Sequence, residues 1–525
     1  MTGTGRLIRL ILRRDRVVLP IWILVFGLLP AAYYSSFEGL FPTDAERIGY
    51  ARVSADNAGF VALYGLLHGD SFAALTNWRA GFVPVMIGLV VLLTVIRHTR
   101  TDEEAGRTEL IGSAAIGRHA PLAAALITAA GASLLIGLLT FAGLVGKSGS
   151  VSGSLAFGAE FAAAGWIFAG IAAITAQLTS SARSARSIAI VALGVSYALR
   201  VGGDISALGT GSLSWLSWIS PLGWVTRIFP YGPLNWWPVV LSVLLTVVAV
   251  AVAVYLRGRR DLGDGLFAAR LGRATATPSL RTPLALAWRL HRGLLVGWTV
   301  GLGLLGLIFG GVGGSVLDIA KDNKGLSDIF ARLGGSTEIV DSYFAGTAGL
   351  VGLIAACYAV QATLRLRDEE TTGHAEAVLA TSVPRLTWAG SHLMFSLLGP
   401  ALALLAEGVV TGLVYTQGNF AHIVGGVLLQ LPAVWVLASV AVLLFGVLPR
   451  WSAAAWAASA ACLLILLVGE TLRLNHWLLD ISPFTHVPHL PGGTVSATPV
   501  LTLLVVALVL GAVGLAGLRR RNLPD

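Results

Sequence analysis

The stretch RTDEEAGRTELIGSAAIGR, residues 100–118, is a charged island between two long apolar segments, and this alternation decides the fold. Hydrophobic residues make up 55% of the 525-residue chain and charged residues only 12%, with a mean hydropathy of +0.79. Water-soluble domains of this size do not have such a composition. The sequence therefore predicts an integral membrane protein whose charged islands connect its membrane spans.

Apolar windows of about 20 residues, the length that crosses a bilayer core about 30 Å thick, recur along the chain. They lack the period-two alternation of a transmembrane barrel, so helices are expected to satisfy the backbone groups. The predicted spans are 17–35, 80–97, 119–145, 155–178, 184–202, 237–256, 294–316, 345–364, 387–416, 423–448, 453–472 and 497–518. We expect an all-α integral membrane protein with about twelve transmembrane helices.

Positive charge predicts the orientation of these spans. Arginines precede the first span and no small-residue cleavage site follows it, so this segment is expected to remain as the first helix, with a cytoplasmic N-terminus. In the resulting topology 26 of the 36 Lys and Arg residues face the cytoplasm, although Lys147, Lys321 and Lys324 do not. The net charge of +9 then indicates topology and contact with anionic membrane lipid, not nucleic-acid binding. Both termini of this multi-pass plasma-membrane protein are expected inside the cell.

The two halves of the chain share short sequences in the same order. Residues 16–22 and 292–298 each begin with Arg and end with Trp, and both halves carry an Ile-Ser-Pro motif, at 219–221 and 481–483. The charged islands align at a constant offset of 267: Arg100, Asp102, Glu103, Gly106, Glu109 and Arg118 face Arg367, Glu369, Glu370, Gly373, Glu376 and Arg385.

These matches predict an internal repeat. We assign residues 1–256 to a first six-helix repeat, 257–292 to a basic cytosolic linker and 293–525 to a second six-helix repeat. Because six spans are an even number, the two repeats have the same topology and are parallel, and their interface is the natural place for a transport pathway.

The acids of each island raise a question of function. Acids are favoured where a helix begins, and Glu103 stands four residues before Arg107, the spacing of a helical ion pair, so we expect a short cytosolic helix there. A charged loop that only keeps a connection in water is the plain alternative. The positive-inside rule needs Arg but not acids repeated in register, which favours a docking surface for a soluble partner.

The island pattern Arg-x-Asp/Glu-Glu-x-x-Gly-x-x-Glu, the Ile-Ser-Pro motif and the run RRDLGDG at 259–265 resemble permease subunits of ABC-type exporters. The closest resemblance is to actinobacterial two-repeat permeases that export polyketide antibiotics of the tetronasin type, or multiple drugs. It covers essentially the whole chain. It implies that 100–118 and 367–385 are coupling helices, each docked on an ATPase protomer. In the second island Thr371, Thr372 and Pro384 replace Glu104, Ala105 and Gly117, so the two docking sites differ.

The chain encodes no energy source of its own. No GxxxxGK[ST] loop follows a strand, and Gly146-Lys147-Ser148 only imitates the end of one, in a segment expected outside. We therefore expect no enzyme, cofactor or metal site in this chain, and two copies of a separate ATPase that binds ATP and Mg²⁺. The cargo would be hydrophobic or amphipathic small molecules. The alternatives are a proton-coupled transporter, an ABC permease for lipid, and an intramembrane enzyme.

Acids and aromatic residues near the spans are candidates for the substrate pathway. Glu407 lies within a predicted span, and Glu470 and Glu160 lie near span ends, so each is a functional candidate, with an internal hydrogen bond or an interfacial partner as the alternative. Trp218 and Trp224 belong to a Trp- and Pro-rich segment, residues 212–238. An aromatic belt at the membrane interface explains this segment more simply than a re-entrant hairpin at the outer mouth.

Overall fold

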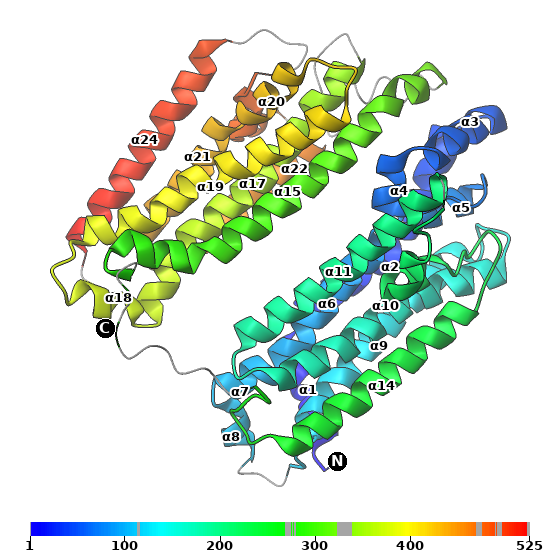
Figure 1. Ribbon diagram of the computed structural model, residues 1–525, viewed down its shortest axis with the longest axis horizontal. Helices are drawn as coiled ribbons and strands as arrows, with labels where there is room; N and C mark the ends of the chain where they lie inside the picture. Colours follow the sequence, from blue (N-terminus) through cyan, green and yellow to red (C-terminus); the bar gives the residue numbers. More distant parts are fainter. Residues whose placement is uncertain are drawn as a thin grey trace. The chain divides into compact units, whose positions relative to one another are not determined.

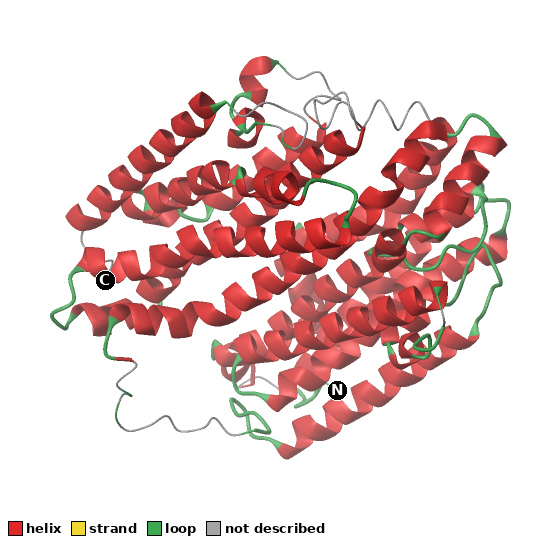
Figure 2. Ribbon diagram, turned by 45° about the horizontal axis from the view of Figure 1, so that its top comes forward, coloured by secondary structure: helices red, strands yellow, loops and turns green. Residues whose placement is uncertain are grey.

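The computed structural model describes residues 2–112, 116–209, 211–267, 275, 277, 280–322, 339–468, 475–488, 490 and 496–521. Throughout these residues the regular structure is helical, and no strand occurs (Figure 2). The chain divides into two compact units, Met1–Gly272 and Arg273–Asp525, and each is a bundle of long helices (Figure 1). The all-α prediction is confirmed.

The first unit contains six long membrane helices and several short ones. Its helices are α1 (Thr4–Arg14), α2 (Val18–Leu40), α3 (Asp44–Ala55), α4 (Ala58–Tyr64), α5 (Phe72–Arg79), α6 (Val83–Ile96), the π-helical turn η1 (Arg97–Thr101), α7 (Asp102–Glu104), α8 (Arg107–Gly112), α9 (Ala120–Leu144), α10 (Val151–Leu178), α11 (Ala182–Leu208), α12 (Leu216–Ile219), α13 (Pro221–Thr226) and α14 (Trp237–Arg259).

The second unit repeats the general plan with fewer short helices among its described residues. Its helices are α15 (Pro283–Asp322), α17 (Ile339–Thr371), α18 (His374–Leu379), α19 (Arg385–Val414), α20 (Phe420–Leu428), α21 (Leu431–Val447), the 3-10 turn η3 (Pro449–Trp451), α22 (Ala454–Val468), α23 (His476–Leu479), the 3-10 turn η4 (Pro483–His486) and α24 (Ala497–Arg520).

The described residues contain eleven helices long and apolar enough to cross a membrane. A shorter apolar helix, Ala454–Leu466, lies at the predicted eleventh span, 453–472, and residues 469–472 of that span lie outside the described part of the chain. The predicted tenth span is divided between α20 and α21. The chain is therefore a multi-pass membrane protein with about twelve membrane helices. Helix also occupies both ends of the predicted linker 257–292, because α14 ends at Arg259 and α15 begins at Pro283.

One helix forms the centre of each unit. In the first unit α10 packs against α6, α9, α11 and α14, and 78% of its apolar window is buried, against 17% for α14. In the second unit α17 has the central position, against α15, α19, α21 and α22. Many of the buried positions of α10 carry Ala or Gly, small residues that let membrane helices approach closely.

Local sequence explains where many helices begin. The hydroxyl of Ser150 accepts a hydrogen bond from the amide of Gly153 at the start of α10, and Ser71 does the same for Ala74 at the start of α5. Proline lies in the first turn of α6, α9, α14 and α21, where its missing N–H leaves no helical bond unmade. The Ile-Ser-Pro motif combines both signals, since Ser220 and Ser482 cap the turns that Pro221 and Pro483 begin.

Backbone contact between α21 and α24 gives a first prediction. A Cβ atom at Gly446 would lie 1.8 Å from the carbonyl oxygen of Gly514, so Gly446→Ala must push the two helices apart. Overpacking of this kind costs about 1–3 kcal/mol, and we expect a lower midpoint of thermal unfolding in detergent. Gly425→Ala in the nearby α20 is the matched control, because nothing lies within 4 Å of a Cβ at Gly425. Equal midpoints for the two variants would contradict the packing.

Candidate functional site

The first charged island lies at the end of a continuous helix, not at the start of a new one. Helix α6, the turn η1 and α7 form one helical rod, Val83–Glu104, and Asp102, Glu103 and Glu104 are its last residues. In the second unit residues 368–370 form the last turn of α17. The prediction that these acids begin helices is wrong. Acids are unfavourable at the C-terminal end of a helix dipole, so other contacts must stabilise them there.

Glu103 is held by two arginines in a buried ion-pair network. Arg260, just after α14, donates from Nη1 and Nη2 to Oε1 and Oε2 of Glu103, at 2.6 and 2.7 Å. Arg100 lies 3.1 Å from the same carboxylate, and the amide of Gly263 donates to it at 2.9 Å. Glu103 is 8% exposed and Arg100 1% exposed. The network joins the end of the second membrane helix to the segment after the last helix of the unit.

The second unit has a corresponding network. Arg521, just after α24, donates from Nη2 to Oε1 of Glu370 at 2.5 Å, and Arg367 lies 3.5 Å from the other oxygen. A further contact is shared: Arg118 donates to the carbonyl oxygen of Arg260 at 2.7 Å, and Arg385 donates to that of Arg521 at 2.7 Å. We call each set a clasp: Arg100, Glu103, Arg118 and Arg260 in the first unit, and Arg367, Glu370, Arg385 and Arg521 in the second.

A glycine separates the clasp from the rest of each island. Gly106 has φ +69° and Gly373 has φ +74°, a left-handed conformation that L side chains rarely adopt. Each glycine ends the helix that carries the acids and lets the chain turn into α8 or α18. The spacing Glu-x-x-Gly that both islands share thus has a backbone reason. Crowding does not require the glycines, because nothing lies within 4 Å of a Cβ at either position.

Asp102 and Asp15 connect α1 to the first island. Arg14 donates to Asp102 at 2.7 Å, and this hydrogen bond raises the pKa of the Arg14 guanidinium although partial burial lowers it. Asp15, 3% exposed, lies between α1 and α2 and pairs with Arg97 at 3.1 Å and with Nε2 of His98 at 2.5 Å. Both contacts fix α1 against the end of the second membrane helix.

The predicted Glu103–Arg107 ion pair does not form. Arg107 pairs with Asp102 at 2.8 Å, because Gly106 breaks the helix between them and Glu103 turns inward to Arg260. In the second island Glu369 is also buried, and it pairs with Arg365 at 2.9 Å. Of the acids that align between the two islands, Glu109 and Glu376 are exposed. Glu109 on α8 and Glu376 on α18 can therefore meet a partner.

The two islands also differ where their sequences differ. Glu104 accepts a hydrogen bond from the amide of Ala182 at 3.0 Å, at the start of α11. Thr371 and Thr372 of the second island donate instead to carbonyl oxygens of their own helix, including that of Asp368. The first island is thus tied to one additional membrane helix.

A cleft of about 420 Å³ opens beside the first clasp. Its lining includes Glu103, Thr108, Arg118, Arg257 and Arg260. With Asp261, which also lines it, the cleft has three guanidinium groups and two carboxylates, a small positive balance that suits an acidic side chain of a partner. Within the described residues no group of three His, Cys, Asp or Glu side chains is placed to hold a metal ion.

Sequence comparison places the chain among known transport proteins. A family model described as the C-terminal domain of the multidrug efflux system permease Rv1217c matches residues 6–256 and 280–519. The chain is also 42% identical over 528 residues to the multidrug efflux system permease protein Rv1217c of Mycobacterium tuberculosis (strain ATCC 25618 / H37Rv), covering 99% of this chain and 95% of that protein. The chain belongs to this permease family. The resemblance to exporter permeases is confirmed.

Glu407 of the permease lies in a tight crossing of membrane helices. Its Oε1 accepts a hydrogen bond from Thr411 at 2.9 Å, and a Cβ at Gly306 of α15 would lie 2.6 Å from the Glu407 carbonyl oxygen. Glu407 is 2% exposed, so an internal hydrogen bond accounts for its position, and a role in substrate binding stays a prediction. Glu160 is buried and accepts from Asn77 at 2.7 Å, instead of reaching the interface. Glu470 lies outside the described residues.

The Trp-rich segment of the permease folds back as two short helices, α12 and α13. Trp224 donates from Nε1 to the carbonyl oxygen of Trp218 at 2.6 Å, so the two predicted pathway residues contact each other. Trp218 is 45% exposed, whereas Ser217 and Ser220 are buried against α11. The segment is therefore a hairpin packed on the bundle, and its outward tryptophans still fit an interfacial belt.

Arg200 and Asp204 of α11 hold this hairpin and the helix α4. Arg200 donates to the carbonyl oxygens of Val61 and Ala62 in α4 at 3.1 and 2.9 Å. Asp204 accepts from Ser217 at 2.8 Å and pairs with Arg227 at 3.2 Å. Both Arg200 and Asp204 are 1% exposed. This buried network fixes the end of the first unit opposite to its clasp.

Several of these residues were missed by the sequence reasoning. Arg260 and Arg521 belong to the basic runs 257–260 and 519–521, which end the two units. The sequence shows these runs, but it does not show which acid of each island the arginines contact. Asp15 could have been noticed as a lone acid among the N-terminal arginines. Arg200 lies within the predicted span 184–202 and Asp204 two residues beyond it, and their spacing of four residues could have indicated a longer helix with a buried pair.

Proposed function

We propose that the permease is the membrane-spanning subunit of an ATP-driven exporter of hydrophobic or amphipathic small molecules, drugs and antibiotics among them. Two copies of a separate cytosolic ATPase would bind ATP and Mg²⁺ and dock on the two islands. The single observation that carries this proposal is the clasp in each unit, which fixes a short exposed helix to the ends of two membrane helices. The name of the relative, a multidrug efflux system permease, supports the cargo class.

The clasps suggest how force would reach the membrane helices. In the first unit the island is continuous with α6 and ion-paired to the segment after α14, so a movement of α8 must move both helix ends. In the second unit Glu370 and Arg521 link α17 and α24 in the same way. Closure of an ATPase dimer would shift both islands, and each six-helix unit would repack between two states.

Site-specific photo-crosslinking tests the docking surface. We expect a photoreactive residue at Glu109 or Glu376 to crosslink the ATPase in cells that express both proteins, because both positions are exposed beyond the clasps. Trp477 is the matched control: it is 83% exposed and belongs to a loop expected on the opposite face of the membrane. A crosslink at Trp477 as strong as those at Glu109 and Glu376, or no crosslink at any position, would contradict the docking.

The alternative of proton-coupled transport predicts a different outcome. A proton-coupled transporter would work in the absence of any ATPase and would depend on a membrane carboxyl such as Glu407. Glu407→Gln keeps the hydrogen-bonding shape of the side chain and removes the titratable group. If the proposal is correct, this variant retains ATP-dependent export within about a factor of three, because the amide oxygen of Gln can still accept the hydrogen bond from Thr411 and a weakening of that bond costs only about 0.5 kcal/mol.

A further inference from the structure

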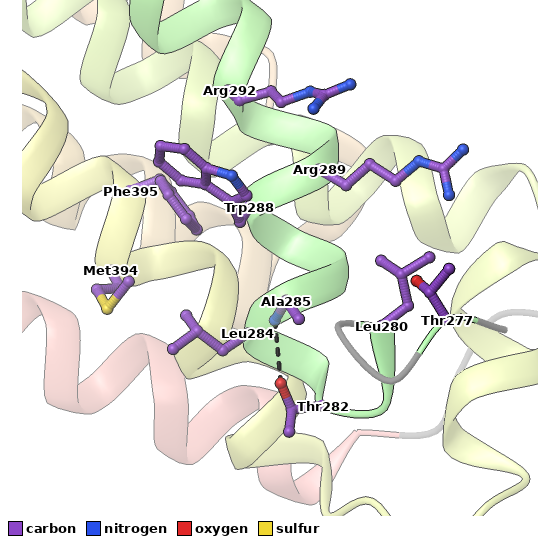
Figure 3. Close-up of a pocket in the computed structure, with 10 residues that line it drawn as sticks. All are labelled: Thr277, Leu280, Thr282, Leu284, Ala285, Trp288, Arg289, Arg292, Met394 and Phe395. Atoms are coloured by element: carbon purple, nitrogen blue, oxygen red, sulfur yellow. Dashed lines mark hydrogen bonds between the residues drawn. The ribbon is translucent and has the colours of Figure 1, made fainter.

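A pocket of about 690 Å³ lies in the second unit where α15 begins beside α19 (Figure 3). Its apolar lining includes Leu284, Trp288, Met394 and Phe395, and two arginines, Arg289 and Arg292, complete it. In Figure 3 the guanidinium groups extend to one side of α15, and Trp288, Phe395 and Met394 lie on the other. The pocket thus has a cationic side and an apolar side, and its size falls within the range of small-ligand sites.

The length of α15 places this pocket in the headgroup layer of the membrane. The span Pro283–Gly313 has 31 residues and is about 45 Å long at 1.5 Å per residue, whereas the bilayer core is about 30 Å thick. Residues 293–313 carry no charge and are long enough to cross that core alone. The first ten residues, with Arg289 and Arg292, therefore extend into the headgroup layer, where Trp side chains such as Trp288 are enriched.

The charges of the pocket are available to a ligand. Arg289 and Arg292 are exposed, and within the described part of the chain no acidic side chain pairs with either of them. Trp288 is 51% exposed although it is a large apolar residue. Two free guanidinium groups beside an open apolar wall fit a molecule with an anionic head and a hydrocarbon tail.

The corresponding segment of the first unit, α1, has a different structure. There α1 is a separate amphipathic helix, and its Leu7 and Ile11 are buried against Ala120 and Ala124 of α9. In the second unit the corresponding residues are the first turns of the uninterrupted α15. The pocket therefore depends on the continuous helix α15 and is a feature of the second unit only among the described residues.

We propose that this pocket binds an anionic phospholipid from the cytoplasmic leaflet. Arg289 and Arg292 hold the phosphate, and an acyl chain lies along Leu284, Trp288 and Phe395. Cytoplasmic leaflets attract basic segments at the membrane surface, which matches the side on which positive charge predicts this end of α15. The site needs neither the ATPase nor a transported molecule.

Lipid retention by the purified full-length permease tests the site. The protein is equilibrated with mixed phosphatidylglycerol and phosphatidylcholine micelles, and bound lipid is counted by native mass spectrometry. We expect the wild type to retain phosphatidylglycerol in preference to phosphatidylcholine, and Arg289→Gln with Arg292→Gln to lower that affinity about tenfold. Excess inorganic phosphate should not displace the lipid, because it lacks the acyl chain.

Two further variants keep the test decisive. Arg6→Gln with Arg9→Gln removes the same charge from exposed positions of α1 and should leave the tightly bound lipid in place. Ala285→Trp fills the pocket, keeps both arginines and should displace the lipid at an unchanged unfolding midpoint. Equal loss in both double variants, equal retention of the two lipids by the wild type, or displacement by inorganic phosphate alone would each overturn the proposal.

Discussion

Glu103→Gln is expected to destabilise the cytosolic end of the first unit by about 3–5 kcal/mol and to abolish coupled export. The substitution keeps the shape of the side chain but leaves Arg100 and Arg260 buried without a negative partner. An uncompensated buried charge is far more costly than a lost surface ion pair. Thermal unfolding in detergent measures the stability, and hydrogen exchange of residues 100–112 and 259–267 shows where the loss occurs.

Glu109→Gln is the control for this result. Glu109 is exposed and has no ion pair among the described residues, so its replacement should change stability by less than about 0.5 kcal/mol. Adding Arg260→Met to Glu103→Gln should recover part of the loss, since one of the two unpaired charges is then absent. If Glu103→Gln is as stable as Glu109→Gln, Glu103 is not held in a clasp.

Asp204→Asn is expected to cost about as much at the opposite end of the unit, roughly 3–5 kcal/mol. Asp204 is the only carboxylate paired with Arg200 and Arg227 among the described residues, and Asn would leave both arginines buried and uncompensated. The hairpin α12–α13 should then become more accessible to protease and to hydrogen exchange. Transport should fall as well if this hairpin covers the exit of the pathway.

Asp44→Asn provides the matched comparison for Asp204→Asn. Asp44 pairs with Arg47 at 3.0 Å, but its side chain is 85% exposed, and such surface pairs contribute only about 0–1 kcal/mol. Both substitutions remove one carboxylate from the same end of the unit. Equal protection of residues 204–232 in the two variants would contradict a structural role for the buried network.

The membrane helices could be predicted from the sequence because their signal is local. The predicted span 119–145, for example, agrees with α9, Ala120–Leu144, to within one residue at each end. The second span was predicted to end at residue 97, yet the helix continues to Glu104. Residues 97–104 are so rich in charged side chains that the sequence alone predicts a loop there. Partners more than 150 residues away, such as Arg260, allow these residues to remain helical and buried.

The charged islands could be identified from the sequence. Which of their acids are buried in ion pairs and which are exposed could not. The repeat at an offset of 267 pointed to Glu103 and Glu370, and their contacts with Arg260 and Arg521 depend on where the last helix of each unit ends in space. Spacing along one helix favoured Arg107 as the partner of Glu103. The left-handed Gly106 removes that geometry, because it ends the helix between the two residues.

Transport by reconstituted vesicles tests the central claim most directly. The purified permease is inserted into vesicles with and without the proposed ATPase, and movement of a hydrophobic fluorescent cation is followed before and after addition of ATP and Mg²⁺. We predict movement only when both proteins and ATP are present, and loss of that movement with Glu103→Gln but not with Glu109→Gln. Movement driven by the permease alone, with or without a proton gradient, would contradict the account.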